Sequence, residues 1–340
     1  MFGGELAPAA PRRFAPLSVL LFKQRCRLVP LQRGGSMPHF PVPQRYRMAM
    51  ADHTEGEATL PNIRTRYVLV DGIRTQYLEA GDGEETIVLL HGGAFGEDAW
   101  LSWEPNIPAL AERYRVVAPD WLGFGGTDKI RDFVSGAGRM IDHMTQFLRV
   151  MCINDAHFGG LSMGGTFLLK VAALGAPKWP IRSVFVASGG GFIPANDARQ
   201  VLLDYDQTMD KMRQLVSVAY ADPKFAEDNE FVKLRWEKSL VPGAWETSAS
   251  ARFKAPATPP RSEFGLPDDT PYEQISVPVL YTAGGKDQLR EPGYATDLAE
   301  RTPDARLVEF PECGHVLNVE SADEWNKLVL SFLAEVTGSA

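Results

Sequence analysis

The stretch that decides the fold is GLSMGG, residues 160–165. A short apolar run typical of a buried strand, residues 156–159, leads into it, and a helical apolar run, residues 167–174, follows it. A serine on a tight strand-to-helix turn has a crowded backbone and needs small residues two positions before and after it, where glycine stands here. The helix start also favours negative charge nearby. The pattern predicts that Ser162 is a nucleophile, against the plainer interpretation of a glycine-rich loop.

Outward from this turn, short apolar runs alternate with helical stretches. Runs of strand length cover residues 65–70, 73–79, 86–90, 114–120, 156–159, 183–188, 277–283 and 305–310. Helical stretches cover residues 104–113, 138–151, 163–174, 292–301 and 322–335. Strands buried on both faces and separated by helices are typical of a parallel sheet with right-handed crossovers. The sequence therefore predicts an α/β fold with a mostly parallel, doubly wound sheet.

The alternation is interrupted between residues 190 and 272. This stretch is helical and aromatic, and it ends in a proline-rich segment, residues 256–271. It predicts a helical cap, residues 190–272, inserted into an α/β core made of residues 61–189 and 273–340.

The N-terminal segment, residues 1–60, differs in composition from the rest. Its first fifty residues carry eight basic residues, one acidic residue and seven prolines, without a regular apolar period. Such a segment buries too little apolar surface to offset its ordering entropy. We expect a disordered or mis-assigned extension, with a targeting peptide as the other interpretation.

Composition excludes several classes of function. The 340 residues carry a net charge of −8, which argues against a nucleic-acid binder. Three cysteines without a Cys/His cluster argue against disulfides and a metal site and favour the cytoplasm. No apolar run is long enough to span a membrane, and no dinucleotide fingerprint is present. We expect an enzyme of a small-molecule substrate that uses no cofactor, with its oligomeric state left open.

A serine nucleophile needs a base held by a third group. Of the six histidines, His315 follows the last predicted strand at the carboxyl edge of the sheet, where open α/β folds bind ligands. His91 stands after another strand and is a weaker candidate for the base. Asp287 follows the strand at 277–283 and lies between the serine and His315 in the chain, whereas Asp304 precedes its strand. We predict Asp287 as the orienting acid.

These motifs resemble the α/β-hydrolase superfamily over roughly residues 65–336. Those that carry the resemblance are HGG at 91–93, DWLGFGGTD at 120–128, GLSMG at 160–164, GKD at 285–287 and CGH at 313–315. The order Ser, Asp, His is that of the superfamily. The resemblance implies an oxyanion hole from the backbone N–H groups of Gly93 and Met163.

Within the superfamily, the cap and the CGH motif resemble the meta-cleavage-product hydrolases, which split a carbon–carbon bond in vinylogous diketones. That resemblance implies a cap arginine, Arg235, on the substrate carboxylate; His91, Gly92 and Trp236 complete the predicted substrate site. The plainer interpretation of Arg235 is a surface ion pair with Glu230 or Glu237. Departures stand at three places: the loop after Gly93, Leu161 before the serine, and Val316 after the histidine. A carboxylesterase or lactonase with the same three residues is the alternative, and a slow-turnover receptor is the alternative from another class.

Overall fold

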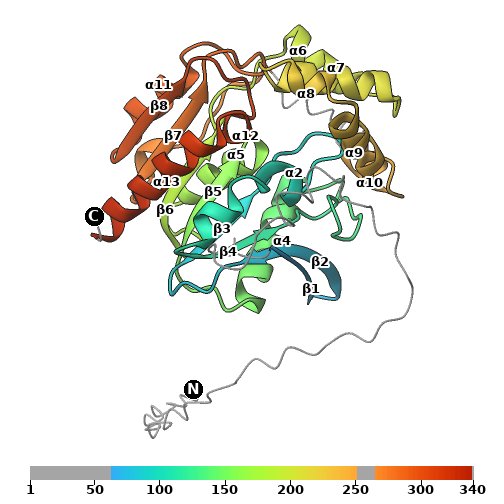
Figure 1. Cartoon of the computed structure of the whole chain (residues 1–340). Helices are drawn as coiled ribbons and strands as arrows, with labels where there is room; N and C mark the ends of the chain where they lie inside the picture. The colour runs from blue at the N-terminus through green and yellow to red at the C-terminus, as the bar shows by residue number, and fades with distance from the viewer. Residues whose placement is uncertain (1–62, 251–264, 339–340) are drawn as a thin grey trace, which may run out of the picture. The chain divides into compact units, whose positions relative to one another are not determined.

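The sheet of the computed structural model, which describes residues 63–250 and 265–338, has eight strands in the order β1-β2-β4-β3-β5-β6-β7-β8 (Figure 1). The strands are β1 (Arg64–Val70), β2 (Ile73–Ala80), β3 (Thr86–Leu90), β4 (Arg115–Pro119), β5 (Ala156–Leu161), β6 (Ile181–Ala187), β7 (Val279–Gly284) and β8 (Ala305–Phe310). The pairs β1–β2 and β2–β4 are antiparallel, and the others are parallel. The predicted fold class is confirmed.

Helices cover both faces of this sheet (Figure 1). One apolar layer holds α2 (Ala99–Trp103), α3 (Ile107–Ala111) and α13 (Ala322–Thr337), and the other holds α4 (Ala137–Val150), α5 (Met163–Ala172) and α11 (Tyr294–Arg301). Central strand β3 serves both, because Ile87 and Leu89 pack in the first layer while Val88 and Leu90 pack in the second. Burial on both faces explains why the central strands read as continuous apolar runs.

The helix predicted at residues 104–113 is shorter in the structure, where α3 covers Ile107–Ala111. A separate short helix, α2, lies just before that stretch and was not predicted. Helix α2 ends at Trp103, because Pro105 has no N–H to continue the helical hydrogen bonds, and its C-cap residue Glu104 is still in helical conformation. At the other end, Asp98 caps α2 by accepting a hydrogen bond from the Leu101 N–H.

In the stretch predicted as a cap, between β6 and β7, the described residues form five helices. They are α6 (Asp197–Leu203), α7 (Met209–Ala219), α8 (Lys224–Glu227), α9 (Asn229–Ser239) and α10 (Ala244–Ala249), and a 3-10 helix, η2 (Tyr272–Gln274), follows. We call residues 190–272 the cap segment; its action as a cap stays a prediction. The expected N-terminal extension and part of the proline-rich segment lie outside the described residues. Among the described helices, none is long and apolar enough to span a bilayer.

Candidate active site

Ser162 occupies the turn between β5 and α5. Its backbone has φ 50 and ψ −112, an angle pair that few non-glycine residues adopt. The Ser162 N–H donates to the Ala187 carbonyl of β6 at 2.9 Å, which anchors the turn to the neighbouring strand. A strained residue held by its surroundings is typical of functional sites.

The glycines around Ser162 are required by close backbone contacts. A Cβ atom added to Gly160 would lie 2.5 Å from Cα of Gly165, and one added to Gly164 would lie 2.3 Å from the carbonyl oxygen of Leu90. Both distances are far inside van der Waals contact. The structure therefore confirms the steric reason for small residues two positions before and after the serine.

His315 lies beside Ser162, although the two residues are 153 positions apart in the chain. Its Nε2 atom is 2.7 Å from Ser162 Oγ, and its Nδ1 atom is 2.7 Å from Oδ2 of Asp287. The other carboxylate oxygen of Asp287 accepts the Leu289 N–H at 2.8 Å. The three side chains form one hydrogen-bonded line, and they come from the carboxyl ends of β5, β7 and β8.

Burial and charge set the protonation states of this line. Burial lowers the pKa of His315, with Asp287 opposing the shift and Arg199 and Arg290 adding to it. Burial by itself would raise the pKa of Asp287, but His315 and Arg290 outweigh it and hold the pKa below its ordinary value. At neutral pH the line therefore holds a neutral imidazole next to a carboxylate, the states that a general base and its orienting acid need.

Gly93 and Met163 meet at the start of α5. A Cβ atom added to Gly93 would lie 2.5 Å from Sδ of Met163. Within the described part of the chain, neither backbone N–H donates a hydrogen bond to another residue. Both groups are thus available to an oxygen beside Ser162, as the predicted oxyanion hole requires.

The His91 ring is engaged by other residues, which does not favour its predicted place in the substrate site. The ring is fully buried, its Nε2 atom accepts the Trp121 N–H at 2.9 Å, and its Nδ1 atom lies 2.6 Å from the Gly92 carbonyl. The ring therefore joins the loops after β3 and β4. The Gly92 N–H is also engaged, since it donates to Ser102 Oγ at 3.4 Å.

Arg235 and Trp236 lie on α9 and already have partners in the protein. The Arg235 side chain is 1% exposed and forms an ion pair with Glu97, a residue that sequence reasoning missed. The plainer interpretation predicted a surface ion pair with Glu230 or Glu237. Arg235 does form an ion pair, but the pair is buried and its acid is Glu97. The Trp236 indole N–H donates to the Gln207 carbonyl at 2.8 Å within the cap segment.

Glu320 is another residue that sequence reasoning missed. Its carboxylate accepts the backbone N–H groups of Ala221, Asp222 and Gly314 at 2.8 to 3.0 Å. It therefore ties the residue before His315 to the end of α7 in the cap segment. No periodic or spacing pattern in the sequence predicts the bonds from Glu320 to Ala221 and Asp222, because these positions are about a hundred residues apart.

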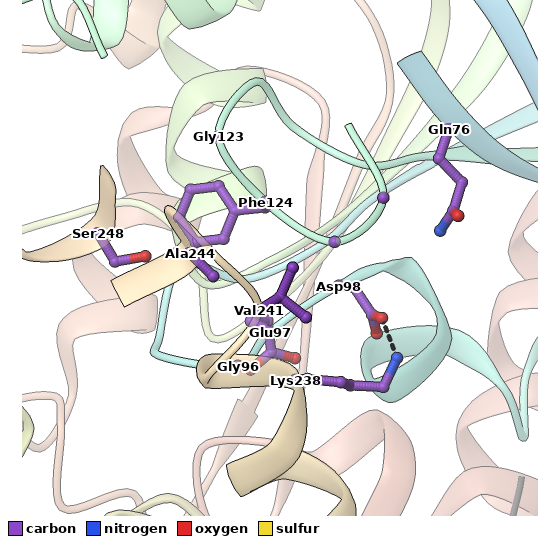
Figure 2. Close-up of a pocket in the computed structure, with 12 residues that line it drawn as sticks. Gln76, Gly96, Glu97, Asp98, Gly123, Phe124, Lys238, Val241, Ala244 and Ser248 are labelled. Carbon is purple, nitrogen blue, oxygen red and sulfur yellow. Dashed lines mark hydrogen bonds and ion pairs between the residues drawn. The ribbon is translucent and has the colours of Figure 1, made fainter. Parts of the chain in front are cut away.

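A cavity of about 110 Å³ lies between the loops after β3 and β4 and the end of α9 (Figure 2). Its lining residues are Gln76, Gly96, Glu97, Asp98, Gly123, Phe124, Gly125, Gly126, Lys238, Val241, Ala244 and Ser248. The lining includes neither Ser162 nor His315, so this cavity is separate from the candidate site. Across the described residues, no group of three or more His, Cys, Asp or Glu side chains could hold a metal ion.

This fold, with a serine turn at its centre, defines the class of α/β-fold hydrolases. The chain belongs to the alpha/beta hydrolase family, whose model matches residues 87–328.

Within this family, the chain is similar to the following curated proteins and solved structures. The chain is 31% identical to a 2-hydroxymuconate semialdehyde hydrolase from Pseudomonas sp. (strain CF600), over 81% of this chain and 95% of that protein. It is 30% identical to a 2-hydroxy-6-oxo-6-(2'-aminophenyl)hexa-2,4-dienoic acid hydrolase from Metapseudomonas resinovorans, over 81% and 93%. A meta-cleavage product hydrolase structure from Pseudomonas fluorescens IP01 superposes with a TM-score of 0.71 at 27% identity, over 79% and 97%. These relatives are hydrolases, which favours the enzyme over the receptor.

Proposed function

We propose that this hydrolase uses Ser162, His315 and Asp287 as a catalytic triad, and that it cleaves a carbon–carbon bond in a vinylogous diketone of the meta-cleavage type. The observation that carries the proposal is the hydrogen-bonded line from Ser162 Oγ through His315 to Asp287. Relatives named for 2-hydroxymuconate semialdehyde and related dienoates support the substrate class.

In the proposed mechanism, the dienol substrate is first converted to its keto form, with His315 moving the proton. His315 then takes the Ser162 proton as Oγ attacks the carbonyl carbon, and the N–H groups of Gly93 and Met163 stabilise the oxyanion. The carbon–carbon bond breaks as the oxyanion collapses, and the leaving carbon takes the proton from His315. Water, activated by His315, hydrolyses the acyl-serine and releases the second acid.

The test compares two substrates with the purified protein. Multiple turnovers that bleach a coloured 2-hydroxy-6-oxo-dienoate and release two acids are the expected result. The Ser162→Ala variant should release no acid, yet it should still consume the dienol colour slowly, because ketonisation needs His315 alone. If the protein turned over a short p-nitrophenyl ester and left the dienoate intact, the carbon–carbon proposal would fail.

A carboxylesterase or lactonase is the second candidate, and the Arg235–Glu97 ion pair favours it. A guanidinium that already has a buried carboxylate partner is a poorer receptor for a substrate carboxylate than a free one.

If Arg235 binds an acidic substrate, Arg235→Met should raise KM for the dienoate more than for the neutral ester. Equal losses on both substrates would assign Arg235 to packing of α9.

A further inference from the structure

Helix α9 of the cap segment lies directly on the loop that joins β3 to α2, residues 91–98. Gly96 in this loop has φ +71, and a Cβ atom added to it would lie 2.3 Å from the Arg235 carbonyl oxygen. The Arg235 Nε–H also donates to the Phe95 carbonyl at 3.1 Å. The backbones of the helix and the loop are therefore in contact, so a movement of one requires a movement of the other.

The two carboxylate oxygens of Glu97 bond to different helices, α9 and α2. One oxygen accepts from Nη2 of Arg235, and the other accepts the Ser102 hydroxyl of α2 at 2.7 Å. The Glu97 side chain is 7% exposed, so water screens this charge pair only weakly. A charge buried to this degree is stable only with its partner in place.

Ser102 links Glu97 to Gly92 in the same loop. Its Oγ atom accepts the Gly92 N–H at 3.4 Å, and a Cβ atom added to Gly92 would lie 3.7 Å from Cγ of Glu97. Gly92 is the residue immediately before Gly93. A continuous set of contacts thus runs from Arg235 through Glu97 and Ser102 to the peptide that carries the proposed oxyanion donor.

We propose that Glu97 is a positioning residue, which couples the docking of α9 to the placement of the Gly93 N–H. The inference rests on the proposed function, because Gly93 acts as a donor only in that mechanism. Without the Glu97 carboxylate, the buried Arg235 loses its anionic partner, and the loop loses the group that holds α9 and Ser102 together. A displaced donor weakens stabilisation of the oxyanion more than it weakens substrate binding.

The chain supplies a matched control in a second ion pair of α9. Lys238 pairs with Asp98 (Figure 2), one turn along the helix from Arg235. The other oxygen of Asp98 accepts the Leu101 N–H at 2.9 Å and caps α2. This pair therefore holds α9 to the start of α2, and among the described residues the side-chain bonds of Asp98 and Lys238 do not include the Ser102 hydroxyl or the Gly92 N–H.

The experiment compares Glu97→Gln, Ser102→Ala and Lys238→Met in the full chain, on the better of the two substrates above. We expect Glu97→Gln and Ser102→Ala to lower kcat by about 10–100-fold with KM within about threefold, as for a misplaced oxyanion donor. Lys238→Met should keep kcat within about twofold. A small arylboronic acid, which forms an anionic tetrahedral adduct with the serine, should inhibit the first two variants more weakly by the same factor as kcat falls.

The proposal is overturned if Glu97→Gln and Ser102→Ala lose no more kcat than Lys238→Met, or if the whole loss lies in KM with boronate inhibition unchanged. If Glu97→Gln does not fold, Ser102→Ala decides, because it keeps the Arg235–Glu97 pair and removes the hydroxyl that connects Glu97 to the Gly92 N–H. Failure of the proposed function is distinguishable, because Ser162→Ala would then keep its activity whatever the Glu97 variant does.

Discussion

Ser162 and His315 depend on different physical properties of their surroundings. Ser162 stands on a strained turn between β5 and α5, with φ 50, and its proposed role requires two N–H groups near its hydroxyl. His315 needs to be neutral at working pH, and burial together with nearby guanidinium groups lowers its pKa. Asp287 opposes that shift and fixes the ring orientation through the 2.7 Å bond to Nδ1.

Single and double substitutions test whether these side chains act as one unit. Ser162→Ala and His315→Ala should each lower kcat by about 10³–10⁶-fold, and the double variant should be little worse, because either loss already abolishes the activated nucleophile. Steady-state rates measure this. The matched control is Ser217→Ala on α7, whose exposed hydroxyl bonds only the nearby Gln214 carbonyl and should keep near-normal kcat. Near-normal turnover of Ser162→Ala would refute the triad.

The lowered pKa of His315 predicts the acid side of the pH profile. The base must be neutral, and a lowered pKa means that protonation needs a lower pH than for an ordinary histidine. The profile of kcat/KM should therefore fall with an apparent pKa below the ordinary value of about 6.5.

Asp287→Asn provides the check on this assignment. Removing the carboxylate that stabilises the imidazolium should move the acid limb to still lower pH while lowering the maximal rate by about 10⁴-fold. An acid limb that lies above the ordinary range in the unmodified protein would contradict the assignment of His315 as the base.

The turn between β5 and α5 is the element on which the site depends. The turn crosses β3 so closely that the Leu90 carbonyl fills the space of a Gly164 side chain. Strand β5 is itself buried at every position, and it runs to Leu161, two residues beyond the predicted end. Because β5 runs to the residue before Ser162, it fixes the position of the serine at the carboxyl edge of the sheet.

Gly164→Ala should disrupt this element. The new methyl group would lie 2.3 Å from the Leu90 carbonyl, so α5 must shift, at a cost of about 1–3 kcal/mol or more in the free energy of unfolding. The same shift should lower kcat, because Ser162 moves with the helix. Urea unfolding and steady-state kinetics measure both effects.

Gly175→Ala is the control for Gly164→Ala. It lies just after α5, and a Cβ atom there would meet nothing within 4 Å, so the free energy of unfolding should change by less than about 0.5 kcal/mol. Equal tolerance of both substitutions would show that the turn has more room than the contacts indicate.

At the scale of the whole molecule, the site is assembled from strands that are distant in the chain. Parallel pairing aligns the carboxyl ends of β5, β6, β7 and β8 at one edge, which brings Ser162, Asp287 and His315 together. The cap segment reaches the same edge, since the His315 N–H donates to the Ala219 carbonyl of α7 at 2.9 Å. The proposed base, His315, is therefore held by the core and the cap segment together.

Deletion of residues 1–50 tests the division of the chain. These residues carry eight basic residues, one acidic residue and seven prolines, a composition that buries too little apolar surface to form part of a core. We expect the melting temperature to change by less than about 2 °C and kcat to stay within about twofold. Thermal unfolding and ester or dienoate turnover measure this. A large loss of melting temperature, or insolubility of the truncated protein, would contradict it.

The sequence by itself determined the elements that local physics controls. Buried parallel strands need continuous apolar runs, and the serine turn needs glycines, so both could be predicted from short stretches. Chain order then placed Asp287 and His315 after their strands, and the structure brings both within hydrogen-bonding distance of their partners. Helix α2 was not predicted, although Asp98 before it is a residue type that commonly caps a helix.

Only the tertiary structure decided which partner each polar side chain takes. Arg235 pairs with Glu97 across 138 positions, and His91 joins the backbone of Trp121. Glu320 likewise accepts the N–H groups of Ala221 and Asp222, which lie 99 and 98 positions away in the chain. A buried charge or donor bonds whatever the approach of two elements brings near it, and that approach depends on packing of the whole chain, which no local pattern records.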